Sequence, residues 1–249
     1  MTKIIGHRGA AGLALENTIK SIQTAREYNV DAIEFDVRLT KDEHVVLSHD
    51  RHLARVSINP SKIAELELDE VLKVELFDDH RISTLQDAIK ACGDTPMVIE
   101  LKELGMAERV LEILEKYKDK SITITSLWHD ELRVVRKQRP DIPILVRDQL
   151  SPIDIVTTAR QMDAAGINLN VWLLNPLTYY LAKRWNLTVM VYTVNHKMLA
   201  RFLNKLYPNI MICTNRPDKF KRKRQLLKQA AKKVKQLKRT KATRKAAVK

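Results

Sequence analysis

The sequence is poor in cysteine and lacks long apolar runs, and both absences narrow the class of protein. Cys92 and Cys213 are its only cysteines among 249 residues and lie far apart, so they form neither a disulfide framework nor a Cys-x-x-Cys metal site. No stretch approaches the roughly 20 apolar residues that cross a bilayer. No apolar segment typical of a secretory signal precedes Gly6. We therefore expect a soluble protein of the cytoplasm.

Acidic residues are absent from the C-terminal stretch 219–249, which contains 15 lysines and arginines. The preceding residues contain 29 basic and 30 acidic side chains, so the net charge of +14 comes from this tail. We expect two parts, a near-neutral domain over residues 1–218 and a basic, helical or disordered tail over 219–249. The tail could bind an anionic membrane surface and hold the protein at its periphery, bind nucleic-acid phosphates, or only aid solubility.

The domain before the tail shows regular alternation of short apolar strands and amphipathic helices. The expected strands are 3–6, 32–37, 97–101, 122–125, 142–146, 167–170, 188–194 and 210–213, with a further extended run at 44–48. Such alternation over more than 200 residues indicates a parallel sheet covered by helices, and eight strands fit a (β/α)₈ TIM barrel. No G-x-G-x-x-G motif follows a strand, which argues against a dinucleotide-binding fold.

Two carboxylates interrupt the apolar strand 32–37. Glu34 and Asp36 are two residues apart, so their side chains point to the same face of the strand. Burying two anions side by side costs several kcal/mol each unless a cation compensates. One interpretation is an amphipathic edge strand with a polar outer face. The alternative, which we favour, is a site for Mg²⁺ or Ca²⁺, which prefer oxygen ligands.

Further polar residues follow other expected strands. His7 and Arg8 end the first strand, His49 follows the run at 44–48, and Glu100 and Lys102 end the strand 97–101. Chemistry in a TIM barrel sits at the carboxyl ends of the strands. There, carboxylates can hold a cation, two histidines can act as general acid and base, and basic side chains can neutralise phosphoryl oxygens. This combination suits the cleavage of a phosphodiester.

The motifs, taken in order, resemble those of the glycerophosphodiester phosphodiesterase family. The matching stretches are Gly6-His7-Arg8-Gly9, Glu16-Asn17-Thr18, Ile33-Glu34-Phe35-Asp36-Val37, Thr40-Lys41-Asp42, His49-Asp50, Ile99-Glu100-Leu101-Lys102, Tyr192-Thr193-Val194-Asn195 and Thr214-Asn215-Arg216-Pro217. The resemblance spans roughly residues 3–218. It implies a (β/α)₈ barrel that hydrolyses glycerophosphodiesters to glycerol 3-phosphate and an alcohol, with one divalent cation, Mg²⁺ or Ca²⁺.

The resemblance also implies roles for individual residues. His7 and His49 resemble the catalytic acid/base pair, Glu34, Asp36 and Glu100 the metal ligands, Arg8 and Lys102 phosphate contacts, and Glu16 a supporting residue. In the mechanism usual for the family, a glycerol hydroxyl attacks phosphorus, the alcohol leaves, and water opens the cyclic phosphate. We expect His49 to act as the base in the first step. One departure is Asn215, which stands where the family commonly has Asp.

Two other functions remain open from the sequence. A related enzyme that acts on lysophospholipids, like a lysophospholipase D, would share the cation and both histidines. A catalytically silent barrel that uses its basic tail to bind a membrane or a nucleic acid would need none of these groups. The presence of His7, His49 and all three carboxylates argues against the silent barrel.

Overall fold

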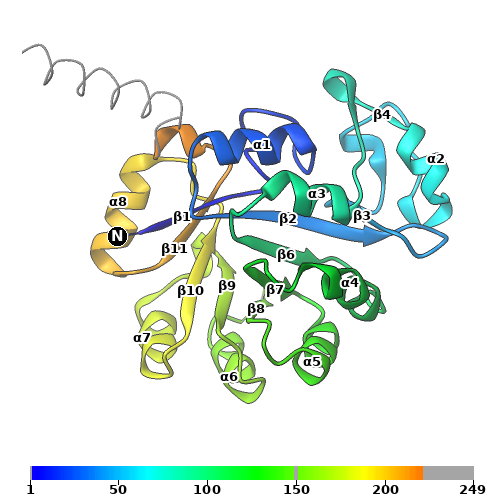
Figure 1. The fold of residues 1–249 in the computed structure, drawn as a ribbon. Coiled ribbons are helices and arrows are strands. Elements are labelled where there is room, and N and C mark those ends of the chain that lie inside the picture. Colours follow the sequence, from blue (N-terminus) through cyan, green and yellow to red (C-terminus); the bar gives the residue numbers. More distant parts are fainter. Residues whose placement is uncertain (1, 149–150, 221–249) are drawn as a thin grey trace, which may run out of the picture.

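The structure is a computed structural model that describes residues 2–148 and 151–220. Its centre is a ring of eight parallel strands (Figure 1). They are β1 (Lys3–Gly6), β2 (Ala32–Leu39), β6 (Met97–Leu101), β7 (Ile122–Ser126), β8 (Ile144–Asp148), β9 (Gly166–Asn170), β10 (Thr188–Tyr192) and β11 (Met211–Thr214). β1 pairs with β11 on one side and β2 on the other, which closes the ring. The predicted (β/α)₈ barrel is confirmed. The predicted basic tail lies, from residue 221 onward, outside the described residues.

Helices cover the outside of the barrel (Figure 1). They are α1 (Ile19–Glu27), α3 (Leu85–Cys92), α4 (Ala107–Leu114), α5 (His129–Gln138), α6 (Asp154–Gln161), α7 (Pro176–Arg184) and α8 (Lys197–Leu206). Thr18 and Thr84 cap the first two of these with their side chains, as Ser and Thr do at helix starts. No helix in the described ranges has the length and apolar character needed to span a membrane.

The alternation of side chains along each strand separates an outer core from an inner one. Ile33, Phe35 and Val37 of β2 are fully buried in the outer core, against the helices. Ala32, on the opposite face of the strand, belongs to the inner core instead. The inner core consists of Ile5, Ala32, Val98, Leu145, Met190 and Cys213, with Tyr192 and Met211 packed against it. The barrel interior is therefore packed, and its apolar layer forms the floor for the residues above.

A small lobe lies between β2 and α3, at one side of the barrel (Figure 1). It begins with β3 (Val45–Leu47), which pairs with β2 in the antiparallel direction, and continues through α2 (Leu68–Lys73), β4 (Glu75–Leu76) and β5 (His80–Arg81). The lobe has its own core of Val46, Leu53, Ile63, Val71, Val74, Leu76 and Ile82. The extended run at 44–48 is thus part of a hairpin and not a ninth barrel strand.

Helix α4 depends on a carboxylate from its neighbour, because Met106 at its start offers no capping side chain. Glu131 on α5, itself buried, accepts hydrogen bonds from the backbone N–H groups of Gly105, Met106 and Ala107 at 2.7, 2.9 and 2.7 Å. Glu131→Ala leaves these three donors without a partner. We expect it to lower the free energy of unfolding by about 3 kcal/mol, measured by urea denaturation. Glu112→Ala, at an exposed position of α4, is the control, with an expected loss of about 0.5 kcal/mol or less. Equal losses in the two variants would contradict this account of α4.

Candidate active site

Toward the carboxyl ends of the strands, the inward-facing residues change from apolar to acidic. On β2, Glu34 and Asp36 follow Ala32 at steps of two and therefore face the barrel interior. On β6, Glu100 follows Val98 in the same way. All three carboxylates are buried, and one oxygen from each lies within 4.8 Å of the others. The structure thus brings together the three acidic residues that the sequence singled out.

Three basic side chains surround this acidic cluster. Lys102 Nζ lies 2.9 Å from Glu100 Oε1 and 3.5 Å from Asp36 Oδ1. Arg8 Nε lies 3.3 Å from Asp36 Oδ2. Arg147, at the end of β8, forms an ion pair with Glu100. Arg8 and Lys102 were expected here from the sequence, whereas Arg147 was not. Arg147 stands two residues after the inward-facing Leu145, so the alternation along the strand was a signal that could have identified it.

The basic side chains offset the negative charge of Asp36 more fully than that of Glu34. Burial alone would raise the pKa of Asp36, but Lys102 and Arg8 more than offset this and hold that pKa below its ordinary value. Burial, followed by repulsion from Asp36 and Glu100, raises the pKa of Glu34 well above its ordinary value. A divalent cation between the three carboxylates would relieve this repulsion, and buried carboxylate oxygens are the donors that Mg²⁺ and Ca²⁺ prefer. The residues present therefore fit such a cation.

His7 follows β1 and is oriented by Asn215. Its Nδ1 lies 2.6 Å from the side-chain oxygen of Asn215. An amide oxygen only accepts hydrogen bonds, so Nδ1 carries the proton and Nε2 keeps a free lone pair. Burial and the nearby charge of Arg8 lower the pKa of His7 to about 4. His7 is therefore neutral at pH 7 and able to accept a proton.

His49 comes to the site from the hairpin of β2 and β3 and not from the barrel. It follows β3, the extended run expected at 44–48, which runs antiparallel to β2 and is not one of the eight parallel barrel strands. The backbone N–H of Ser48 donates to the carbonyl of Asp36 at 3.1 Å, and this contact places His49 next to the acidic cluster. Its Nδ1 lies 2.6 Å from Asp50 Oδ1. Burial lowers the pKa of His49, while Asp36 and Asp50 act in the opposite direction.

Glu16 links the barrel to the small lobe. It accepts hydrogen bonds from Arg8 at 2.8 Å and from both terminal nitrogens of Arg55 at 2.7 Å. Arg55 also pairs with Asp50, the partner of His49. Glu16 therefore holds Arg8 and Arg55 together, and its supporting role in the site stays a prediction. Arg55 comes from the irregular segment of the lobe, and no periodic pattern in the sequence pointed to it.

The loop after β1 has a backbone that only certain residues tolerate. Gly9 has φ +82°, and a Cβ there would lie 2.4 Å from the Ser21 hydroxyl oxygen, so the position requires glycine. Asn17 also has a positive φ; its side chain donates to Asp36 Oδ2 at 2.9 Å and accepts from the Asp36 backbone N–H. The loop thus positions Asp36 from two sides.

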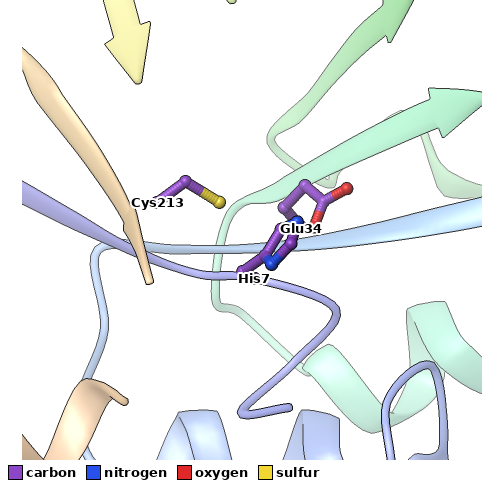
Figure 2. Close-up of side chains that lie close together, drawn as sticks. All are labelled: His7, Glu34 and Cys213. Atoms are coloured by element: carbon purple, nitrogen blue, oxygen red, sulfur yellow. The ribbon is translucent and has the colours of Figure 1, made fainter. Parts of the chain in front are cut away.

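A cavity of about 160 Å³ opens above the cluster. Its lining residues are His7, Arg8, Glu34, Glu100, Arg147, Asn168, Asn170, Met190, Tyr192, Thr193 and Cys213. The Tyr192 ring stacks near the imidazole of His7, with centroids 6.4 Å apart, and its hydroxyl accepts a hydrogen bond from Arg147 at 3.0 Å. Figure 2 shows the His7 ring and the Glu34 side chain close together, with the Cys213 thiol pointing toward them. The cavity is small and polar, and its charged lining consists of two arginines and two glutamates.

A family model and individual proteins of known sequence point to the same family. The model of the glycerophosphoryl diester phosphodiesterase family matches residues 7–219. A glycerophosphodiester phosphodiesterase of Caldanaerobacter subterraneus is 30% identical over 182 residues, which is 67% of this chain and 75% of that protein. Human lysophospholipase D GDPD1 is 34% identical over 161 residues, 58% of this chain. The match spans 51%, about half, of the human protein's length.

Solved structures show the same fold. An Oleispira antarctica phosphodiesterase, determined in complex with the product sn-glycerol-3-phosphate, superposes with a TM-score of 0.83 at 22% identity, covering 88% of this chain and 95% of the other. A putative glycerophosphodiester phosphodiesterase from Galdieria sulphuraria gives a TM-score of 0.77 at 28% identity, covering 87% and 95%.

Proposed function

The chain belongs to the glycerophosphoryl diester phosphodiesterase family and is thus a phosphoric diester hydrolase, and we propose that it hydrolyses glycerophosphodiesters to glycerol 3-phosphate and an alcohol, with one divalent cation and two histidines. The observation that carries the proposal is the buried cluster of Glu34, Asp36 and Glu100, of which Glu34 and Glu100 line a pocket together with His7. The cation is Mg²⁺ or Ca²⁺, because the donors are carboxylate oxygens.

The three carboxylates would hold the cation, which when bound polarises the phosphoryl oxygens and stabilises charge that develops on them. Arg8 and Lys102 lie against the same carboxylates. Both are available as phosphate contacts at the edge of the cluster, where their charges favour an anionic substrate. Arg147 is a third basic side chain at the cluster and lines the pocket together with Arg8.

The partners of the two histidines suggest different roles. Burial and the charge of Arg8 lower the pKa of His7 to about 4 and leave it unprotonated at pH 7, while Asn215 accepts the proton of its Nδ1. Burial holds the pKa of His49 below its ordinary value, but the carboxylates of Asp36 and Asp50, the latter in contact with Nδ1, oppose this and stabilise the protonated imidazole. We therefore assign the first-step base to His7 and the first-step acid to His49, which reverses the order expected from the sequence.

The chemistry then runs in two steps. The glycerol hydroxyl attacks phosphorus while its proton moves to Nε2 of His7, the bond from phosphorus to the leaving alkoxide breaks, and His49 donates a proton to that alkoxide. This gives a cyclic glycerophosphate and the free alcohol. In the second step His49 takes a proton from water, the resulting hydroxide opens the ring, and His7 returns its proton to the glycerol oxygen. Both histidines thus return to the protonation states in which they started.

The direct test of the function is product release from a panel of glycerophosphodiesters with choline, ethanolamine, glycerol and inositol headgroups. We expect release of glycerol 3-phosphate that depends on added Mg²⁺ or Ca²⁺. An enzyme inert toward every diester with either cation would favour the catalytically silent barrel.

The His7–Asn215 contact predicts a specific change in pH dependence. Asn215→Asp places a carboxylate on Nδ1 of His7, and an adjacent negative charge raises the pKa of an imidazole by roughly 1–2 units. His7 must be neutral to act as a base, and its pKa in the wild type is about 4. The acidic limb of the kcat/KM profile should therefore move to higher pH. A limb that stays in place in Asn215→Asp would contradict the assignment of His7 as base.

Hydrolysis of lysophospholipids is the second candidate, and it is favoured by the similarity to human lysophospholipase D GDPD1. Trp172, which follows β9 and is 83% exposed, offers an apolar contact beyond the pocket. Lysophosphatidylcholine added to the same panel separates the two candidates. Release of choline from the lysolipid with a higher kcat/KM than from glycerophosphocholine would establish the second.

The boundary at residue 218 and the role of the basic tail are also proposals. We propose that residues 219–249 attach the enzyme to anionic membrane surfaces in the cytoplasm, because each basic residue near such a surface contributes about 1 kcal/mol. Comparing the full chain with a chain that ends at 218, on anionic liposomes and on RNA, tests this. Liposome binding that survives truncation would contradict it, and loss of RNA binding alone would assign the tail to nucleic acid.

A further inference from the structure

A thiol lies next to the acidic cluster and has no part in the proposed hydrolysis. Cys213 is on β11, faces the barrel interior and is 1% exposed. Its sulfur, a ring nitrogen of His7 and a carboxylate oxygen of Glu34 all lie within 4.8 Å of one another. Figure 2 shows these three side chains converging from different strands. A thiol, an imidazole and a carboxylate form a donor set quite different from three carboxylates.

The existing contacts leave a donor atom available on the imidazole and on the carboxylate. The side-chain oxygen of Asn215 accepts the Nδ1 proton of His7, which leaves Nε2 to bind a metal. Metal-bound histidines usually donate their other ring N–H to a carbonyl or carboxylate oxygen in this way. The backbone N–H of Arg8 donates to Glu34 Oε2 at 2.8 Å, which leaves Oε1. The contacts of Asn215 with His7 and of Arg8 with Glu34 thus resemble the hydrogen bonds that orient histidine and carboxylate ligands in metal sites.

The distances suit a small tetrahedral ion. Zn²⁺ binds sulfur at about 2.3 Å and nitrogen or oxygen at about 2.0–2.2 Å, so its ligand atoms lie roughly 3.5 Å apart. The three donors, at most 4.8 Å apart, reach this spacing by side-chain shifts of about 1 Å. A water or a substrate oxygen would complete the four positions.

We propose that His7, Glu34 and Cys213 form a second metal site, which binds Zn²⁺. Zinc bound there excludes Mg²⁺ or Ca²⁺ from the neighbouring cluster of Glu34, Asp36 and Glu100. Thiolate and imidazole ligands select zinc over Mg²⁺ and Ca²⁺. The thiol proton passes to water as the zinc–sulfur bond forms. Because Glu34 belongs to both donor sets, the two ions compete for it.

Zinc at this site has a consequence for activity, and this part rests on the proposed function. It removes Glu34 from the carboxylate cluster and occupies the His7 lone pair that accepts the proton. Zn²⁺ should therefore inhibit hydrolysis, and excess Mg²⁺ should relieve the inhibition. Binding itself does not depend on the reaction and can be measured separately.

The binding test uses Co²⁺ as a spectroscopic substitute for zinc, added alone to the full chain. We expect a thiolate-to-cobalt charge-transfer band in the near ultraviolet that Zn²⁺ removes by displacement. Cys92→Ala is the matched control, because Cys92 is the other buried cysteine and lies on α3; it should keep the band. Cys213→Ala should lose it, and so should Cys213→Ser, which preserves the size of the side chain if alanine destabilises the barrel.

The variants also separate this proposal from the proposed function. Zn²⁺ affinity from competition with Co²⁺ or a chelating dye should fall at least about 100-fold in Cys213→Ala and remain unchanged in Cys92→Ala. A wild type without the band, or zinc that binds Cys213→Ala as tightly as the wild type, would overturn the second metal site. Loss of hydrolysis with the band intact would instead count against the proposed function alone.

Discussion

Replacing His49 with alanine is expected to lower kcat for glycerophosphocholine by about 10²–10⁴, the usual contribution of a positioned general acid. The structure orients His49 through Asp50 and places it beside the acidic cluster. Its removal leaves the leaving alkoxide without a proton donor. The fold should persist, because His49 is partly exposed and belongs to none of the three hydrophobic cores described above. Steady-state kinetics, with circular dichroism as a check on folding, measures the loss.

The leaving group distinguishes the two histidines. A nitrophenyl leaving group needs no proton, so His49→Ala should lose much less activity on glycerophospho-p-nitrophenol than on glycerophosphocholine. His7→Ala removes the base and should lose a similar factor on both substrates. The matched control is His52→Ala, since His52 is an exposed residue of the small lobe. Equal losses on both substrates in His49→Ala would contradict its role as the acid.

Removing the divalent cation is expected to lower the rate of hydrolysis at least as much as His49→Ala does. Metal stabilisation of transition-state charge contributes several kcal/mol, so chelation with EDTA should lower hydrolysis by about 10³ or more. Activity should return with Mg²⁺ or Ca²⁺ after the chelator is removed. Without a cation, the burial and the repulsion from Asp36 and Glu100 that raise the pKa of Glu34 are uncompensated, so apo protein should also bind substrate phosphate less well.

Two variants show whether Mg²⁺ affinity depends on Glu34 itself or only on the net charge of the protein. Glu34→Gln should weaken the affinity for Mg²⁺, measured by calorimetry, because it removes one of three anionic ligands. Glu112→Gln removes an exposed carboxylate of α4 and should leave the affinity unchanged. Activity that survives exhaustive chelation, with Mg²⁺ affinity equal in both variants, would contradict metal dependence.

The fold was predictable because the sequence repeats one physical pattern. Each barrel strand is short and apolar, and each helix that follows shows helical periodicity, so the order of elements determined the (β/α)₈ class. The side chains of Glu34 and Asp36 were predicted to share a face for the same reason. The small lobe was not predictable in this way, since its 3₁₀ turns and two-residue strands β4 and β5 have no period long enough to recognise.

The site was predictable where its residues follow strand alternation and not where they depend on tertiary contacts. Arg147 was missed because the strand was expected to end at residue 146, whereas β8 continues to Asp148. The hairpin that delivers His49 and the contact of Arg55 with Glu16 arise from packing of the lobe. The orientation of His7 by Asn215 joins residues 208 positions apart, and no local pattern reports such a pair.

The most direct test of the account is an anomalous difference map from crystals grown with Mn²⁺ and glycerol 3-phosphate. Manganese shares the oxygen-ligand preference of Mg²⁺ and can be located by its anomalous scattering. We predict one strong peak between Glu34, Asp36 and Glu100, with the phosphate beside it and within reach of both His7 and His49. A manganese peak away from these carboxylates, or a phosphate bound beyond the reach of either histidine, would contradict the account.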